Sequence, residues 1–266
     1  MLQFIDQIGR KVQLRGPTRR IISLVPSQTE LLYDLGLDSE VIGITKFCVH
    51  PGNWRSEKNI IGGTKNLNIE KIKSLKPDLI IANKEENEQK QIEVLSELFP
   101  VWTSDIQNLE DALLMITELG NICAKPEVAK TIIVTITKNF STIDQRNNDK
   151  KLKVLYLIWK DPYLSVGKDT FIHDMLTRCG FQNCLENQLR YPELTSKQVT
   201  DLKPDLIFLS SEPYPFSNKQ FPEFYKILPN SSIHLVDGEM FSWYGSHLIK
   251  ACDYFKSILI EVNSPS

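Results

Sequence analysis

The sequence predicts an α/β protein with two lobes, each containing a parallel sheet flanked by helices. The first observation is a phrase that occurs twice, as LKPDLIIA at 75–82 and LKPDLIFL at 202–209. The second is that apolar, strand-like runs alternate with helical patterns around both phrases. The third is a stretch between the halves, residues 108–144, whose pattern is helical throughout. We therefore expect two lobes joined by a long rigid helix, with a ligand cleft between the lobes.

The spacing of the repeated phrase sets the size of the lobes. Pro77 and Pro204 are 204 − 77 = 127 residues apart, about half of the 266-residue chain. A period of that length is too long for a solenoid repeat. We place the N-terminal lobe at 1–105, a helical linker at 106–150 and the C-terminal lobe at 151–266.

The first half begins with a strand pair in residues 1–14 that turns at Gly9. Ser27 and Glu30 form the S-x-x-E capping-box pattern, which predicts Ser27 as the N-cap of the first helix. Gly36 ends that helix. The other elements expected in this half are strands at 21–25, 41–44, 79–82 and 101–102, and helices at 69–75 and 86–98.

The second half repeats this order. Asp169 or Thr170 caps a helix that ends at Gly180. The other expected elements are strands at 154–158, 206–209 and 233–236, and helices that start near 196 and span 218–228.

The stretch between the halves has the pattern of a long helix. Pro126 suits the first turn, since its missing N–H costs nothing there. Apolar residues then recur every three or four positions up to Ile143. A helix from Pro126 to Ile143 would be about 27 Å long at 1.5 Å per residue. A last helix, from about Gly245, is expected to pack back across the lobes.

Composition limits the kinds of partner and the compartment that the chain is expected to have. The net charge of −2 and pI of about 6.1 argue against nucleic acid. No apolar run approaches the roughly 18 residues of a membrane span. The five scattered cysteines predict free thiols, with one Cys179–Cys184 bridge as the alternative. We expect a monomer. No basic and apolar leader is visible, so the chain is either cytoplasmic or an exported protein whose leader was removed.

The candidate site follows from the predicted sheets, because ligands of such folds lie beyond the carboxyl ends of the strands. The residues that follow those strands are rich in aromatic rings and carboxylates. Aromatic rings beside a few polar groups suit a large, flat, partly apolar ligand. The candidate ligand-binding residues are Pro26, Ser27, Phe47, His50, Trp54, Lys84, Glu86, Trp159, Glu212, Tyr214, Phe216, Glu239, Phe241, Trp243 and Tyr244.

Metal and catalytic chemistry have weaker signals. Cys48 and His50 are a candidate soft metal pair, although two ligands do not make a site and packed loop residues are the alternative. Glu85 and Glu86 would hold a cation or only complement a helix N-terminus. The chain shows no Ser-His-Asp order, zincin helix or Rossmann glycine pattern. We expect no catalytic residues and no obligatory cofactor.

Four motifs carry a resemblance to a known family. They are RIISLVPSQTELLYDLG (20–36), NLNIEKIKSLKPDLIIA (66–82), VGKDTFIHDMLTRCGF (166–181) and YPELTSKQVTDLKPDLIFL (191–209). Together they resemble the helical-backbone (class III) periplasmic-binding proteins, which serve ABC importers of vitamin B12, haem and ferric siderophores. The stretches TKFCVHP, NKEEN and DGEMFSWYGS are similar to the cobalamin-binding, or helical-backbone metal receptor, subgroup.

The resemblance implies a solute-binding protein that is periplasmic or membrane-associated. Its ligand would be a cobalamin-like corrinoid or an iron or metal chelate, such as a siderophore or haem, held between the lobes without chemical change. The alternatives are a cytoplasmic corrinoid- or metal-handling enzyme or chaperone, and a module that has lost its ligand.

The resemblance also implies an ABC permease partner. Family members dock through an acidic residue on the rim of each lobe, which meets arginines of the permease. Glu70, seven residues before Pro77, matches that pattern. The equivalent position before Pro204 is Lys197, and Glu193 is the candidate substitute.

Overall fold

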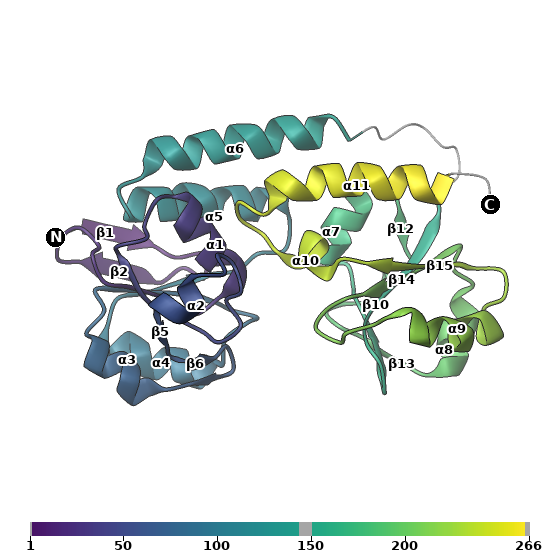
Figure 1. Ribbon diagram of the computed structural model, residues 1–266, viewed down its shortest axis with the longest axis horizontal. Helices are drawn as coiled ribbons and strands as arrows, with labels where there is room; N and C mark the ends of the chain where they lie inside the picture. Colours follow the sequence, from purple (N-terminus) through teal and green to yellow (C-terminus); the bar gives the residue numbers. More distant parts are fainter. Residues whose placement is uncertain (1, 144–150, 264–266) are drawn as a thin grey trace. The chain divides into compact units, whose positions relative to one another are not determined.

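The computed structural model describes residues 2–143 and 151–263. The chain forms two compact units, which are coloured along the sequence in Figure 1. The first comprises Met1–Ile106, Glu110–Thr137 and Tyr244–Ile249; the second comprises Gln107–Leu109, Lys138–Trp243 and Lys250–Ser266. The predicted lobe and linker boundaries stay predictions, and residues 144–150 of that linker lie outside the described residues.

The first unit is built on a five-stranded sheet in which all neighbouring strands are parallel, as predicted. Its order is β5-β4-β3-β8-β9, and β3 and β8 are buried along their whole length. The strands are β3 (Ile21–Ser23), β4 (Val41–Ile44), β5 (Asn59–Ile60), β8 (Leu79–Asn83) and β9 (Val101–Ser104). The helices are α1 (Pro26–Asp34), α2 (Trp54–Glu57), α3 (Ile69–Leu75), α4 (Gln89–Leu98) and α5 (Leu109–Ile122).

Two small hairpins complete the first unit. The predicted N-terminal pair is confirmed as β1 (Leu2–Ile5) and β2 (Lys11–Leu14), which are antiparallel. Gly9 lies in their turn with φ of 82°, a conformation that glycine adopts at little cost. The second hairpin pairs β6 (Gly62–Gly63) with β7 (Asn66–Leu67).

The second unit has a mixed sheet of order β13-β11-β10-β14-β15, with β12 paired to β10. Strands β10 (Lys153–Trp159), β12 (Gln182–Asn183), β14 (Leu206–Ser210) and β15 (Ser232–Val236) are parallel. Strands β11 (Tyr163–Ser165) and β13 (Glu193–Leu194) are antiparallel additions. The sequence did not predict β11, β12 or β13, because strands of two or three residues are too short to show alternation.

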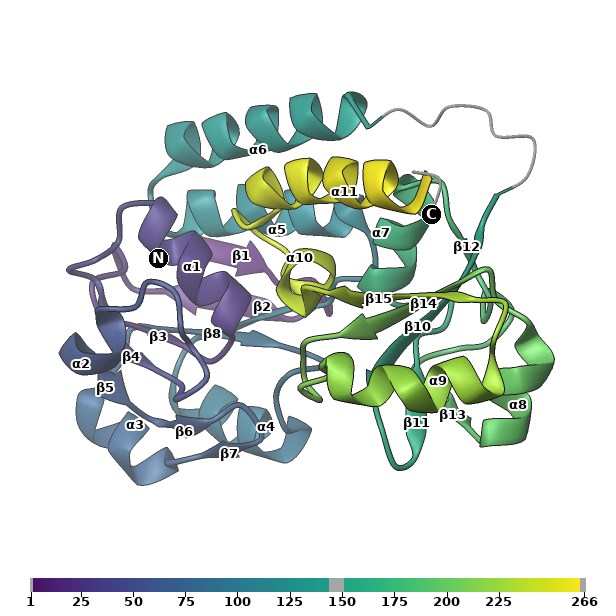
Figure 2. The ribbon, with the colours of Figure 1, turned by 45° about the vertical axis from the view of Figure 1, so that its right-hand side comes forward.

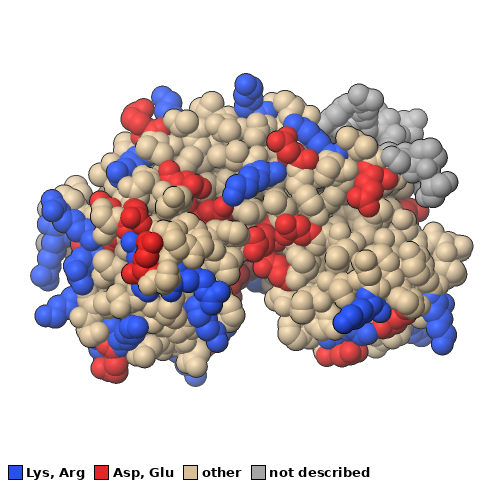
Figure 3. Space-filling model, in the orientation of Figure 1, with Lys and Arg blue, Asp and Glu red and all other residues tan. Residues whose placement is uncertain are grey.

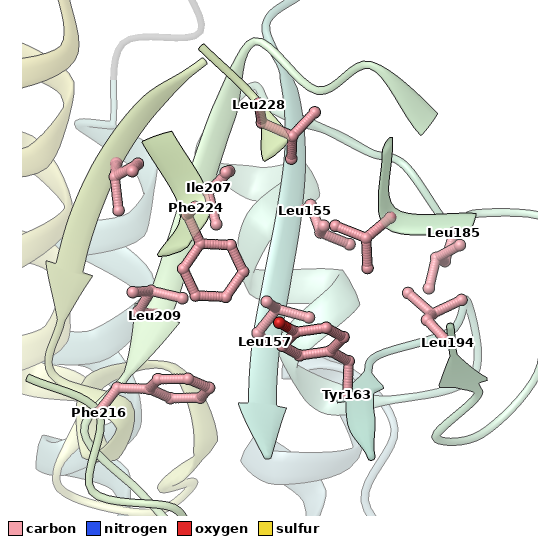
Figure 4. Close-up of a cluster of buried hydrophobic side chains, with 12 residues drawn as sticks. Leu155, Leu157, Tyr163, Leu185, Leu194, Ile207, Leu209, Phe216, Phe224 and Leu228 are labelled. Atoms are coloured by element: carbon pink, nitrogen blue, oxygen red, sulfur yellow. The ribbon is translucent and has the colours of Figure 1, made fainter. Parts of the chain in front are cut away.

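Helices cover both faces of the second sheet. Figures 1 and 2 show α8 (Ser196–Leu202) and α9 (Phe221–Ile227) on one face, and α7 (Phe171–Arg178) and α11 (Leu248–Asn263) on the other. A short 3-10 turn, η1 (Asn218–Gln220), precedes α9, and α10 (Gly238–Ser242) follows β15. Figure 4 shows the core beneath α8 and α9, where leucines of β10 and β14 pack around Phe224 of α9. Helix α6 (Pro126–Ser141) and α11 each contribute residues to both units.

The repeated phrase stops a helix in the same way in both units. Helices α3 and α8 each end on a lysine in the left-handed conformation, Lys76 and Lys203, both with φ of 46°. The following proline cannot continue a helix. The phrase therefore ends a short helix and redirects the chain into the next strand.

The aspartate of the phrase then fixes the strand that follows. Asp78 accepts a hydrogen bond from the backbone N–H of Arg20, at 3.0 Å, and its own N–H donates to the Arg20 carbonyl at 3.0 Å. Asp205 makes the same pair of contacts with Lys153, at 2.8 and 2.9 Å. Each aspartate ties its strand to the start of the neighbouring parallel strand.

Three local predictions have clear outcomes. Ser27 is not the N-cap of α1: the helix begins at Pro26, Val25 is the N-cap, and no side chain caps it, because proline occupies the first turn. Thr170 caps α7, accepting from the His173 N–H at 3.3 Å. All five cysteines are free, so the Cys179–Cys184 bridge is not formed.

Several helix boundaries also differ from expectation: α4 starts at Gln89 rather than 86, and α9 starts at Phe221 rather than 218. Helix α6 ends at Ser141 rather than 143, and α11 starts at Leu248 rather than near Gly245. The α10 segment, for which the sequence predicted no helix, is a single helical turn capped by Asp237, whose carboxylate accepts from the Glu239 N–H at 3.0 Å. Among the described residues, no helix is long and apolar enough to span a membrane.

Candidate functional site

In the first unit, buried amides organise the loop after β8. The Asn83 side-chain oxygen accepts from the N–H groups of Glu85 and Glu86, at 2.8 and 3.0 Å. The Asn87 side chain donates to the carbonyls of Leu24 and Thr64, at 3.3 and 3.1 Å. These bonds fix the turn relative to its neighbours. Neither asparagine was among the predicted site residues, although Asx side chains that bond to nearby backbone are a known turn signal.

The candidate residues on these loops differ in exposure. Lys84 is exposed and its ammonium lies 2.5 Å from an Asp105 oxygen. Glu86 is exposed, Pro26 is half-buried and Ser27 is buried. Lys84 and Glu86 are therefore accessible to solvent, whereas Ser27 belongs to the packed start of α1.

The loop after β4 places the two members of the predicted metal pair in different environments. The Cys48 side chain is fully buried, and its sulfur lies 3.1 Å from the Thr29 hydroxyl and 3.2 Å from the Thr45 hydroxyl. Burial raises the pKa of this thiol, which opposes the thiolate form that binds metals. His50 is half-buried, with its ring 6.1 Å from the His247 ring. No group of three or more His, Cys, Asp or Glu that could hold a metal ion is present in the described part of the chain.

The same loop holds one exposed and one buried aromatic residue. Phe47 is 51% exposed, and the Lys46 ammonium lies 5.0 Å from its ring centre. Trp54 is fully buried, and its indole N–H donates to an Asp38 carboxylate oxygen at 2.5 Å. The Phe47 ring is therefore accessible to solvent, whereas Trp54 packs inside the unit.

Segment 244–249 packs into the first unit through a pair that sequence reasoning did not identify. His247 Nδ1 lies 2.7 Å from a Glu30 carboxylate oxygen, and both side chains are almost fully buried. Tyr244, a candidate ligand residue, is 7% exposed. The S-x-x-E pattern had drawn attention to Glu30, but as a capping partner.

In the second unit, two aromatic candidates meet at the carboxyl ends of β10 and β14. Trp159 is 39% exposed and meets Tyr214 edge-to-face, with ring centres 5.7 Å apart and planes at 70°. Tyr214 is half-buried and contacts Phe216 with a centroid distance of 4.7 Å. Phe216 is 4% exposed and belongs to the core of the unit. The rings of Trp159 and Tyr214 are thus supported by the buried ring of Phe216, which contacts Tyr214.

Beside α10, polar candidates surround an open hollow of about 700 Å³. In Figure 3 a group of acidic side chains lies over α10. One Glu212 oxygen accepts from the Ser242 hydroxyl at 2.8 Å and from the Trp243 indole N–H at 3.1 Å. The hollow is lined by Ser211, Glu212, Leu235, Val236, Asp237, Glu239 and Tyr254.

Two candidates of this region face inward. Phe241 is fully buried, with its ring 5.3 Å from Tyr156 and 4.8 Å from Phe255. Trp243 is 7% exposed, and its N–H is directed at Glu212. The structure therefore gathers Trp159 with Tyr214, and Glu212 with Glu239, while Phe241 belongs to the core.

The candidate docking residues are on the surface. Glu70 is 82% exposed at its side chain and pairs with Lys73 at 2.9 Å. Lys197 is 84% exposed and pairs with Asp201 at 2.5 Å, one turn further along α8. Glu193 is exposed on β13. Neither lysine–carboxylate pair is buried, so solvent screens both.

Similarity to known proteins identifies the family. A relative called vitamin B12-binding protein, from Vibrio campbellii, is 27% identical over 198 residues, which are 73% of this chain and 72% of the relative. The uncharacterized ABC transporter substrate-binding lipoprotein YvrC of Bacillus subtilis is 27% identical over 212 residues, 76% of this chain and 67% of that protein.

The fold is similar to that of a solved structure. The crystal structure of the periplasmic vitamin B12 binding protein BtuF of Vibrio cholerae has a TM-score of 0.80 to this chain at 22% identity, covering 94% of this chain and 99% of that one. Residues 21–226 match the family model described as periplasmic binding protein. The resemblance noted in the sequence is thereby confirmed: the chain belongs to the periplasmic binding protein family.

Proposed function

We propose that the protein is the solute-binding component of an ABC importer. It binds a large, flat metal chelate without changing it chemically, and a cobalamin-like corrinoid is the ligand class that the loops favour. The names of its relatives support this class of function over a corrinoid-handling enzyme or metal chaperone.

The observation that carries the proposal is the aromatic surface of Trp159 and Tyr214. An indole that is 39% exposed leaves apolar area in water, which a stacked macrocycle would cover. The edge-to-face contact with Tyr214, backed by buried Phe216, holds the ring in place before a ligand arrives. Such preorganisation reduces the ordering cost of binding.

The polar groups of the second unit favour a corrinoid over haem. Carboxylates of Glu212 and Glu239 line the hollow next to α10 and act as hydrogen-bond acceptors. The carboxamide side chains of a corrinoid carry N–H donors that suit such acceptors. The propionates of haem would instead meet like charge, which is unfavourable.

The first unit also offers accessible candidates. Phe47, His50, Lys84 and Glu86 have side chains that are exposed or half-buried on loops after β4 and β8. The buried amides of Asn83 and Asn87 hold the second of these loops in one conformation. We include these four residues as ligand contacts of the first unit.

The importer role also needs a permease and an extracytoplasmic location. The description of the Bacillus subtilis relative as an ABC transporter lipoprotein supports both. Glu70 and Glu193 are the proposed docking acids. Asp201 pairs with Lys197 and offsets its charge, so this lysine is a weaker obstacle to an arginine-bearing partner than the sequence alone indicated.

Replacing Trp159 with alanine is expected to weaken cyanocobalamin binding by about 1–3 kcal/mol, or roughly 5- to 150-fold, because a stacked ring loses its apolar partner. Calorimetric titration of both proteins with cyanocobalamin, haemin and a ferric hydroxamate measures the change. Tyr225→Ala is the matched control, since Tyr225 is a 52% exposed aromatic residue on α9 outside the proposed site. An unmodified protein that binds none of the three compounds would refute the proposal.

A further inference from the structure

Glu223 of α9 holds the turn that follows Trp159. Its two carboxylate oxygens accept separate hydrogen bonds, one from the Tyr163 hydroxyl and one from the Lys160 ammonium. Lys160 and Tyr163 stand on either side of the tip of the β10–β11 hairpin. The Glu223 carboxylate therefore bridges the two sides of the hairpin tip.

Tyr163, one end of this bridge, belongs to the core of the second unit. Tyr163 is 7% exposed, and its ring centre lies 5.7 Å from that of Phe224, the residue next to Glu223. Figure 4 shows Tyr163 and Phe224 among the packed side chains of the second unit. The Lys160 side chain is 19% exposed and that of Glu223 is 37% exposed. The Glu223 bridge thus links the buried Tyr163 ring to a turn at the surface.

The turn has a reason to need such a restraint. Asp161, at its tip, has φ of 58°, a left-handed conformation that is unfavourable for residues other than glycine. Trp159 is the last residue of β10, immediately before Lys160. A change in the turn would therefore move the backbone that carries the Trp159 indole away from its contact with Tyr214.

We propose that Glu223 is a positioning residue for ligand binding: by bridging Lys160 and Tyr163 it sets the orientation of Trp159 against Tyr214. The inference rests on the proposed function, since it takes Trp159 as a ligand contact. Glu223 itself does not touch the ligand. Its effect passes through the hairpin tip.

Fluorescence quenching tests the positioning without any ligand. Trp54 and Trp102 are fully buried and Trp243 is 7% exposed, whereas Trp159 is 39% exposed. Quenching of tryptophan emission by neutral acrylamide therefore reports mainly Trp159, and Trp159→Phe should remove most of the quenchable signal. Glu223→Ala is expected to increase the acrylamide quenching constant, because the released turn exposes the indole further.

Ligand titration provides the second measurement. Glu223→Ala should weaken cyanocobalamin binding roughly tenfold, the scale expected when charge-assisted hydrogen bonds are lost. Glu223→Gln keeps an acceptor for the Tyr163 hydroxyl and should fall between Glu223→Ala and the unmodified protein. Lys226→Gln, an exposed charge on the same helix, is the matched control and should change neither readout.

The outcomes separate the two proposals. A folded Glu223→Ala protein with unchanged quenching and unchanged affinity would overturn the positioning role. If Glu223→Ala does not fold, Glu223→Gln and Tyr163→Phe test the positioning role instead, since each removes one part of the bridge. The same two measurements, acrylamide quenching and ligand affinity, apply to them. If the unmodified protein binds no ligand while Glu223→Ala still raises quenching, the proposed function fails and the effect on Trp159 stands.

The Glu223 bridge should also depend on pH. Burial alone would raise the pKa of Glu223, but hydrogen bonds from Lys160 and Tyr163 lower it below its ordinary value of 4.5. The bridge is therefore complete above about pH 4.5 and is lost as the pH falls through the lower folded value. Asp161 is a further charged neighbour of Lys160 and Tyr163. Acrylamide quenching of the unmodified protein should rise below pH 4.5, and the Glu223→Gln protein should lack this step.

Discussion

Phe241→Ala is expected to lower the free energy of unfolding by about 3–5 kcal/mol, the usual cost of truncating a buried phenylalanine. Phe241 is fully buried, and its ring contacts those of Tyr156, Phe208 and Phe255 at centroid distances of 5.3, 6.2 and 4.8 Å. Alanine would leave a cavity lined by these three rings. Urea denaturation followed by far-UV circular dichroism measures the change.

Trp159→Ala is the comparison for this prediction, because it also removes a large ring but from a 39% exposed position. It should cost much less stability than Phe241→Ala while costing more ligand affinity. If Phe241→Ala leaves the urea midpoint where it was, the ring does not support the core as its contacts indicate. The pair of variants separates packing from binding in two aromatic residues that the sequence placed in one list.

Gly167→Ala is expected to destabilise the second unit by about 3 kcal/mol, because it forces an extra carbon into closely packed backbone. A β-carbon at this position would lie 2.6 Å from the Gln188 carbonyl oxygen and 2.7 Å from the Leu189 carbonyl carbon. The backbone cannot easily retreat, since the Gly167 N–H donates to the Arg190 carbonyl at 2.7 Å. Thermal unfolding monitored by circular dichroism should show a clearly lower midpoint.

The control is another glycine-to-alanine change. Gly16→Ala would place its β-carbon in open space, with nothing within 4 Å, and Gly16 does not have the positive φ that disfavours alanine. It should unfold close to the unmodified protein or slightly above it, since alanine restricts the unfolded chain. Equal midpoints for the two variants would mean that the 188–189 backbone yields to the methyl group.

The sequence predicted those elements whose signals are local. The phrase LKPD contains a lysine that ends a helix, a proline that cannot continue it, and an aspartate that bonds to the backbone of the neighbouring strand. Because these signals are local, α3, α8 and the strands after them were predicted to within about one residue. Ser27 failed as a cap because the pattern considers side chains only, whereas Pro26 had already set where α1 begins. β13 was missed because its pairing with β11 depends on residues distant in sequence.

The candidate site was predicted less completely. The rule that ligands lie beyond the carboxyl ends of strands selects loops, but it does not give the direction of a side chain. Trp54, Phe216 and Phe241 follow strands as Trp159 does, yet these three are buried. The composition of a loop cannot distinguish a ring that is exposed to solvent from one that fills the core. Glu223 carried no signal at all, because its role depends on Lys160 and Tyr163, which are sixty or more positions away.

The division of the chain into units has a consequence for biosynthesis. The first unit is not continuous: it includes Tyr244–Ile249, which the ribosome makes only after almost all of the second unit. The hydrogen bond between Glu30 and His247, at 2.7 Å, therefore cannot form while the N-terminal sheet is emerging. Domains usually fold as units during synthesis, in order from the N-terminus. Here the final packing of the first unit must wait until residues 244–249 have been made, so a chain truncated before them would leave both units unfinished rather than one complete and one missing.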